Sequence, residues 1–437
     1  MFQYYLKLSW LSIKRTPILT SLMVLAIGLG ISVSITVLTV DYLMSQDPIP
    51  GKSHKLFHVQ LDTFNDGNEA RTPDGLPVQL TYQDLMNLSQ SKIPSAQTRS
   101  LRSGGTVIPD KQGVNPFLQS IRAIDSDFFT MFNVPFVYGN PWAAEVDTKA
   151  KQVAVIAKSL NDRLFDGKNS VGKTLNIDKK LYEIVGVIDT WEPTPRFYDV
   201  NNGGFSDTEL VFVPFSLLPV LELSSWGNNN AWKPEPIKTY QDKLRSETMW
   251  LQYWVQLDSA VQQEEYREYL AGYIEQQKQL ERFEKENAKG DIKDVVTWME
   301  YNSVVSEDNS VLVGLSFMFL AVCMINTIGI LLAKFLRRAP EVGVRRALGA
   351  SRQQIFIQHL IDVGLIGFAG GVLGLVLAQV GLLGISNLYS NYERLVNMDL
   401  TLIFIAVGIA LGSSLLAGIY PAWVICRTNP SNYLKAQ

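Results

Sequence analysis

The stretch that decides the fold is PILTSLMVLAIGLGISVSITVLTVDY, which runs from Pro17 to Tyr42. Its one charged residue, Asp41, lies at its far end. As a helix these residues would extend roughly 39 Å, enough to cross a bilayer core of about 30 Å with some tilt. A cleaved signal peptide would have a shorter apolar region and a small-residue cleavage site. The sequence therefore predicts an uncleaved transmembrane helix over residues 17–44.

Three further apolar tracts predict transmembrane helices over residues 310–335, 355–385 and 400–426. Lysine and arginine occur only at the ends of these tracts, and the polar stripe of a soluble surface helix is missing. Residues 45–309 have the mixed composition of a soluble domain and are long enough to bury a core. We therefore expect a membrane protein with four transmembrane α-helices and a large mixed α+β extracytoplasmic domain inserted between the first two.

The basic residues predict how the chain is oriented in the membrane. Residues 1–16 hold three basic residues and no acid, and the connection over residues 336–354 is rich in arginine, whereas the loop over 386–399 has one basic residue. By the positive-inside rule both termini, including the tail over 427–437, and the connection face the cytoplasm, and the large domain is periplasmic. This predicts a multi-pass protein of the bacterial inner membrane. Three tryptophans are expected at the membrane interfaces: Trp10, Trp298 and Trp423.

The large domain shows alternating strand and helix patterns from Gln152 onward. A charged amphipathic helix is predicted over 261–287, with Tyr266, Leu270, Ile274 and Phe283 on one side. Residues 110–235 are expected to form an inserted subdomain. The other predicted elements are a helix over Ser159–Phe165 and strands over Val153–Ile156, Leu175–Ile177, Tyr182–Ile188, Glu209–Val213 and Trp250–Leu257.

Composition excludes several classes of function. The formal net charge of −3 argues against a nucleic-acid binder, which needs a basic surface. The two cysteines, Cys323 and Cys426, lie in apolar tracts, and the three histidines are not clustered with them, so we expect no metal site. We also expect no catalytic residues, since no nucleophile elbow or H-E-x-x-H motif is present.

One motif suggests nucleotide binding and must be tested against its context. Residues 167–174, GKNSVGKT, satisfy the G-x-x-x-x-G-K-T pattern of a phosphate-binding loop. That loop needs a strand before it and a helix after it, so that the amides at the helix N-terminus cradle the phosphates. Here the predicted helix precedes the motif and the predicted strand follows it. We therefore predict a turn that leads into a strand.

Close helix packing is suggested by glycines at four-residue spacing, although glycine is also common in membrane spans in general. The pairs are Gly367 with Gly371, Gly370 with Gly374, and Gly408 with Gly412. His359 and Asp362 stand three residues apart, on one face of the third predicted span. A proton relay and a structural or coupling role are both open for them, and their shallow depth favours the second.

Three blocks of sequence resemble the MacB/FtsX-type ABC transporter permeases, in that family's order and over about two thirds of the chain. The first runs from Val153 to Pro214 and includes the false phosphate loop. The second runs from Glu341 to Ser351 and continues through Asp362, where the family usually has Glu, to Gly374. The third runs from Tyr420-Pro421-Ala422 to Tyr433-Leu434.

The resemblance implies that a separate ABC ATPase subunit holds ATP and Mg, since only some sixteen residues precede the first span, and that this chain binds no cofactor. It also implies a second permease, as a homodimer or a sibling heterodimer. The N-terminal segment Tyr4–Thr16 and the connection would receive the motion of the ATPase. The coupling residues implied are Glu341, Val342, Gly343, Arg345, Arg346, Leu348, Gly349 and Ala350. The alternative for Arg345 and Arg346 is that they only satisfy the positive-inside rule and contact lipid headgroups.

Three functions remain open for a member of this family. The first, which the large outer domain favours, is efflux of an amphiphilic compound or peptide with a periplasmic adaptor and an outer-membrane channel. The second is release of lipoproteins from the membrane, and the third is regulation of a cell-wall hydrolase.

Overall fold

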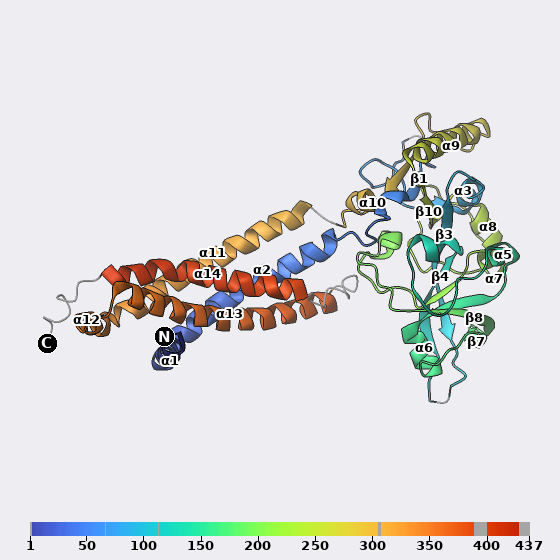
Figure 1. Ribbon diagram of the computed structural model, residues 1–437. Helices are drawn as coiled ribbons and strands as arrows, with labels where there is room; N and C mark the ends of the chain where they lie inside the picture. Colours follow the sequence, from blue (N-terminus) through green and yellow to red (C-terminus); the bar gives the residue numbers. More distant parts are fainter. Residues whose placement is uncertain (1, 66, 112, 305–306, 389–399, 428–437) are drawn as a thin grey trace. The chain divides into compact units, whose positions relative to one another are not determined.

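The computed structural model describes residues 2–65, 67–111, 113–304, 307–388 and 400–427 (Figure 1). The chain divides into two compact units. The membrane unit comprises Met1–Ser45 and Val305–Gln437, and the sheet domain comprises Gln46–Val304. Of the predicted loop over 386–399 and tail over 427–437, all but residues 386–388 and Arg427 lie outside the described residues.

The membrane unit contains the four predicted spans. Among the described residues, α2, α11, α13 and α14 are the helices long and apolar enough to cross a membrane, which confirms the predicted four-span plan. In this unit α2 packs along α11 and α13, and α13 packs along α14. The helices are α1 (Phe2–Arg15), α2 (Pro17–Ser45), α11 (Glu307–Leu336), α12 (Ala339–Ala347), α13 (Arg352–Leu388) and α14 (Leu400–Arg427).

Two of the glycine pairs lie on different faces of α13. A Cβ added at Gly374 would come within 2.8 Å of Ile31 Cγ2 and 3.0 Å of the Gly28 carbonyl oxygen, and one at Gly370 within 2.7 Å of Ile27 Cγ2, all on α2. Gly367 and Gly371 instead face α14, where added Cβ atoms would meet Ser414 and Ala410. Glycine thus allows α13 to approach two neighbouring helices closely at once.

The third pair behaves differently. Gly408 and Gly412 on α14 are exposed, and a Cβ added at either would meet no atom of the described chain within 4 Å. Among the described residues, the structure therefore shows no neighbouring helix packed against this pair. The reason is that Ala406, Ala410 and Ala417, on the opposite face of α14, provide its buried side.

The sheet domain is built on one sheet of eleven strands. The order is β11-β1-β10-β3-β4-β9-β6-β8-β5, with β2 paired to β10 and β7 paired to β3 and β8. The strands are β1 (Leu56–Leu61), β2 (Leu80–Thr81), β3 (Ala96–Val107), β4 (Phe117–Ile124), β5 (Phe136–Gly139), β6 (Val153–Ala157), β7 (Thr174–Ile177), β8 (Lys180–Ile188), β9 (Val211–Pro214), β10 (Met249–Gln256) and β11 (Gly290–Asp294).

Strands from the two ends of the domain sequence and from its middle form opposite halves of this sheet. Residues 110–235, predicted as an insertion, supply β4 to β9, and β4 pairs antiparallel with β3 along eight residue pairs from Ser100↔Ile124 to Val107↔Phe117. The helices of the domain are α3 (Tyr82–Leu88), α4 (Asp127–Met131), α5 (Ala144–Lys149), α6 (Lys158–Phe165), α7 (Leu217–Leu221), α8 (Tyr240–Arg245), α9 (Ala260–Gln279) and α10 (Val295–Tyr301), with 3₁₀ turns at Ser53–Lys55 and Phe197–Asn202.

The helix predicted over residues 261–287 is shorter in the structure. Helix α9 ends at Gln279, and Glu281 has a φ of 55°, a left-handed conformation that a helix cannot continue through. Phe283 is buried as expected, but it packs from the segment after the helix. The guanidinium of Arg282 in this segment binds the carboxylates of Asp84 and Glu247.

The interfacial position predicted for Trp298 is wrong. Trp298 lies on α10 inside the sheet domain, is 2% exposed, and stacks on His58 with 3.7 Å between ring centroids. Burial and the charge of Lys293 lower the pKa of His58 to about 3, so this histidine is neutral and serves as a packing residue.

A buried ion network lies across the middle of the sheet. Arg122 of β4 donates to Glu209 Oε1 at 2.6 Å and binds Asp199, and Arg196 Nη1 lies 3.3 Å from the same Glu209 oxygen. All four side chains are fully buried. Glu209 was predicted to begin a strand, but β9 begins at Val211, and the glutamate serves this network instead.

Candidate functional site

The predicted coupling residues lie on and just after α12, a short helix with well-defined ends. Gly349 has a φ of 101°, a conformation that favours glycine and ends the helix. Ser351 then caps α13: its Oγ accepts from Gln354 N at 3.2 Å, while its own N donates to Gln354 Oε1 at 3.0 Å. The sequence GAS over residues 349–351 thus makes a tight, fixed connection between α12 and α13.

Helix α12 has one buried and one exposed face. Val342 and Gly343 are buried in the membrane unit, whereas Val344 is 48% exposed and Leu348, which follows the helix, is 83% exposed. Glu341 is exposed as well, and Ala350 is half-buried. Glu341, Val344 and Leu348 thus lie outside the packed part of the membrane unit.

The two arginines of α12 anchor it to its neighbours. Arg345 donates to Glu341 Oε1 at 2.7 Å on the same helix and to Gln358 Oε1 of α13 at 3.1 Å. Arg346 donates to the carbonyl oxygen of Cys426 on α14 at 3.4 Å. These contacts go beyond what the positive-inside rule requires of the two residues.

His359 and Asp362 belong to a buried polar cluster at the α12 end of the membrane unit. Asp362 is fully buried, accepts from Ser12 Oγ of α1 at 3.2 Å, and lies 4.0 Å from both Arg338 and His359. Arg338, the residue before α12, donates to Ser12 Oγ at 2.5 Å. The cluster therefore joins α1, the start of α12 and α13.

Lys334 on α11 and Ser9 on α1 complete the cluster. Both are buried and lie close enough to Asp362 to act on its carboxylate, Lys334 through its charge and Ser9 through its hydroxyl. Lys334 Nζ has no hydrogen-bond partner within standard distance among the described residues. Ser9, Ser12, Lys334 and Arg338 were not among the predicted site residues. A signal was available for the serines, because Ser9 and Ser12 stand three residues apart and so lie on one face of α1.

The phosphate-loop motif has the wrong structural context, as predicted. The chain runs from helix α6 through the motif into strand β7, the reverse of a phosphate-binding loop. Gly172 N donates to the carbonyl of Ile184 at 2.8 Å and Lys173 N to that of Ser170 at 2.9 Å, so these amides are engaged within the protein.

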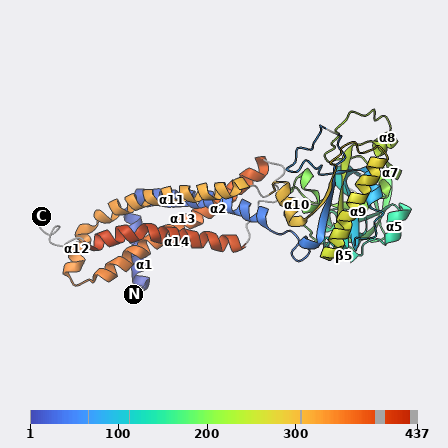
Figure 2. The ribbon, with the colours of Figure 1, turned by 90° about the horizontal axis from the view of Figure 1, so that it is seen from above.

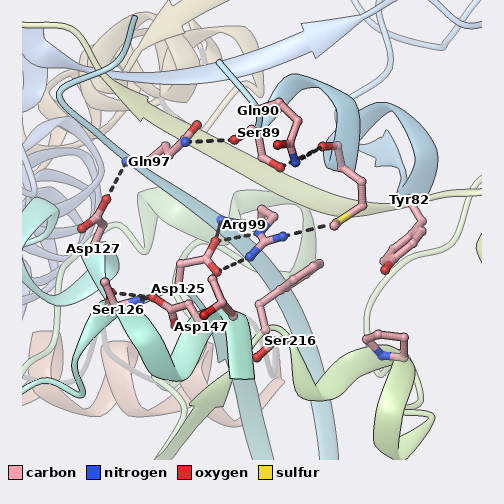
Figure 3. Close-up of a pocket in the computed structure, with 15 residues that line it drawn as sticks. Tyr82, Ser89, Gln90, Gln97, Arg99, Asp125, Ser126, Asp127, Asp147 and Ser216 are labelled. Carbon is pink, nitrogen blue, oxygen red and sulfur yellow. Dashed lines mark hydrogen bonds and ion pairs between the residues drawn. The ribbon is translucent and has the colours of Figure 1, made fainter. Parts of the chain in front are cut away.

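A pocket of about 520 Å³ opens beside β3 in the sheet domain, and Figure 3 shows the side chains that line it. Arg99 forms a bidentate pair with Asp125, at 2.9 and 2.7 Å. Burial and the charge of Asp125 raise the pKa of Asp147, which accepts from Ser126 N at 2.9 Å. These carboxylates are held by protein donors. No group of three or more His, Cys, Asp or Glu side chains suited to a metal ion occurs within the described ranges.

Both units of the chain match models of known protein domains. A model of the MacB-like periplasmic core domain matches residues 20–273, and a model of the FtsX-like permease C-terminal matches residues 313–430. Among curated proteins, the chain is 23% identical to the macrolide export ATP-binding/permease protein MacB of Wolinella succinogenes, over 74% of this chain and 44% of that protein. It is 20% identical to YvrN of Bacillus subtilis, an uncharacterized ABC transporter permease, over 99% of both chains.

Among solved structures, the periplasmic region of MacB from Actinobacillus actinomycetemcomitans is 15% identical and matches 58% of this chain and 97% of that chain, with a TM-score of 0.36. The chain spans about half the length or less of the MacB relatives that it matches. The two family models, which follow one another along the chain, are consistent with the four spans and the sheet domain. The chain belongs to the MacB/FtsX-type family of ABC transporter permeases.

Proposed function

We propose that this permease couples ATP hydrolysis on a separate ATPase subunit, which holds ATP and Mg, to a conformational change of the sheet domain. That change would expel an amphiphilic compound or peptide. The observation that carries the proposal is α12, a short helix fixed at both ends that leaves Glu341, Val344 and Leu348 exposed. Such a helix can dock on a partner through charge and shape.

The contacts of α12 support a path for the motion. Arg338 at its start contacts α1 through Ser12 and lies near Asp362 of α13, so a displacement of α12 would strain both helices. α11 ends just before Arg338, and along the chain α11 and α2 are the two helices that connect directly to the sheet domain. A motion of α12 would therefore act on the sheet domain through these two spans.

The proposal includes further partners. A second permease, identical or a sibling, would complete the transporter, with both termini and α12 on the cytoplasmic side of the membrane. Efflux would also require a periplasmic adaptor and an outer-membrane channel.

A charge swap tests the docking role of α12. Glu341→Arg together with Arg345→Glu keeps an opposite-charge pair four residues apart but inverts the surface pattern. We expect binding of the co-expressed ATPase subunit to weaken about tenfold, which corresponds to roughly 1.4 kcal/mol, and its permease-dependent ATPase activity to fall. Pull-down titration and phosphate release measure the two effects.

The sheet domain offers a matched control. Glu145 and Lys149 on α5 form an exposed pair of the same spacing, at 2.8 Å, so Glu145→Lys with Lys149→Glu should leave binding and activity unchanged. Unchanged ATPase binding in the α12 swap would refute the docking role.

The partners that co-purify in mild detergent distinguish the possible functions. An ATPase with an adaptor supports efflux. An ATPase with a sibling permease and bound lipoproteins would instead indicate lipoprotein release, and a cell-wall hydrolase would indicate a regulator.

A further inference from the structure

Helix α1 also has an exposed face, on the side away from the serine that contacts Arg338 and Asp362. Lys7, Trp10, Leu11 and Lys14 are exposed. Trp10 and Leu11 each stand three or four residues from both lysines, so the four side chains lie on one side of the helix. We call these four residues the outer face of α1. Trp10 is 55% and Leu11 46% exposed, so both apolar side chains lie outside the packed part of the membrane unit.

The opposite side of α1 is fixed to the membrane unit by polar contacts. Ser9 and Ser12 are buried there, and Ser12 is bonded to both Asp362 and Arg338. Turning the helix to bury Trp10 would expose these serines and leave the carboxylate of Asp362 without its hydrogen bond from Ser12. The polar cluster therefore sets which side of α1 faces outward.

The position and charge of the outer face identify its surroundings. Thr16 alone separates α1 from the apolar span α2, and α1 turns away from the axis of that span (Figure 2). The helix therefore lies at the level where the apolar core of the bilayer ends. Residues 1–40 contain no acid, and Lys14 Nζ lies 5.7 Å from the centre of the Trp10 ring. Interleaved lysine, tryptophan and leucine are typical of helices that lie in an anionic lipid surface.

We propose that the outer face of α1 binds anionic lipid headgroups, with Lys7 and Lys14 contacting phosphates and Trp10 and Leu11 lying among the upper acyl chains. This inference goes beyond the proposed function and does not depend on which partner α12 takes. A protein partner for the same face is less consistent with its position next to the start of a span.

Lipid-specific quenching tests the proposal in the full chain. Cys323 and Cys426 are replaced by alanine, and Leu11→Cys is labelled with a small fluorophore. The protein is placed in nanodiscs that contain a phosphatidylglycerol or a phosphatidylcholine with a nitroxide near the top of its chain, at equal mole fraction. We expect quenching by the anionic lipid to be about threefold greater, because each lysine near a surface attracts anionic lipid measurably.

Charge reversal of the outer face supplies the decisive comparison. Lys7→Glu with Lys14→Glu should reduce the ratio of the two quenching values to about one, since the attraction for anionic lipid is lost. The control, Lys168→Glu with Lys179→Glu, reverses two exposed lysines of the sheet domain and should leave the ratio unchanged. Equal quenching by both lipids in the parent protein would overturn the proposal. So would stronger quenching by a water-soluble nickel chelate than by lipid, or protection of the label only when the ATPase subunit binds.

Discussion

At the scale of single residues, Arg122 shows how the sheet domain depends on charges that water cannot reach. Its guanidinium is fully buried against Asp199 and Glu209, and Arg196 shares Glu209. Removing one member of such a network leaves an uncompensated buried charge, which lowers the stability of the fold strongly. Replacing the whole network by apolar residues of similar size would cost much less. Each member therefore depends on all the others.

Arg122→Met should destabilise the protein by about 3–5 kcal/mol, because two buried carboxylates lose their main partner. Thermal unfolding of the full chain in detergent, followed by tryptophan fluorescence, measures the change in Tm. Lys149→Ala is the control, since its exposed pair with Glu145 is worth well under about 1 kcal/mol. Similar Tm values for the two variants would contradict the assigned role of Arg122.

Glu209 makes a second prediction at this scale, for the pH dependence of stability. Burial alone would raise its pKa, but the charges of Arg122 and Arg196 outweigh burial and lower it from 4.5 to about 2. The unfolded chain thus takes up this proton first as the pH falls. The stabilisation is fully present above pH 4.5 and is lost between 4.5 and about 2.

We therefore expect the gap in Tm between the unmodified chain and Glu209→Gln to be large at neutral pH and to shrink as the pH falls below 4.5. Melting curves across this range measure the gap. Glu268→Gln, at an exposed position of α9, should show little difference from the unmodified chain at any pH. If the difference in Tm between Glu209→Gln and the unmodified chain stays constant over the whole pH range, the network does not lower the pKa of this carboxyl group.

At the scale of elements, the glycines of α13 determine how closely three spans pack. Gly374→Val would push a side chain against Ile31 and the Gly28 carbonyl of α2, and overpacking of this kind costs about 1–3 kcal/mol. We expect a clear fall in Tm. Gly408→Val introduces the same residue where no described atom lies within 4 Å, and it should change Tm much less. If the two substitutions lower Tm equally, the effect comes from valine in a helix and not from packing.

The elements also show what the sequence can predict. The spans were predicted to within a few residues, because apolar composition alone determines a membrane helix. Helix α9 was predicted to end eight residues too late. The local sequence does not indicate that Arg282 pairs with Asp84 and Glu247, which are distant in the sequence. The spacing of Gly408 and Gly412 matched that of the packed pairs, but spacing does not reveal which face of a helix meets a neighbour.

The candidate site also contains features that the sequence predicts and features that only the packing of the helices creates. The coupling segment was predicted from its resemblance to a family, and its glycine and serine do form the helix end and the cap. The polar cluster was only half predicted. Asp362 stood out as an acid in an apolar tract. Ser12, by contrast, is 350 residues away from it in the sequence, and Arg338 lies in the turn before α12, so only the packing of α1 and that turn against α13 brings the three together.

At the scale of the whole molecule, the chain is two units with separate cores. The sheet domain encloses its own apolar core, and its eleven strands form one connected sheet. A continuous segment of chain that has its own apolar core can fold alone, and the sheet domain is one such segment. A fragment over Gln46–Val304 should therefore be soluble and unfold cooperatively, as monitored by near-UV circular dichroism and urea titration.

Fragment boundaries also test the predicted insertion over residues 110–235. That segment contains β4 but not β3, whose eight paired residues run along the full length of β4. A fragment over 110–235 would expose this edge, together with buried side chains such as Ile121 and Ala123, and unpaired apolar edges favour aggregation. We expect it to aggregate, while the Gln46–Val304 fragment stays monomeric by size-exclusion chromatography. A soluble, cooperatively folded 110–235 fragment would show instead that the two halves of the sheet are independent subdomains joined at β3 and β4.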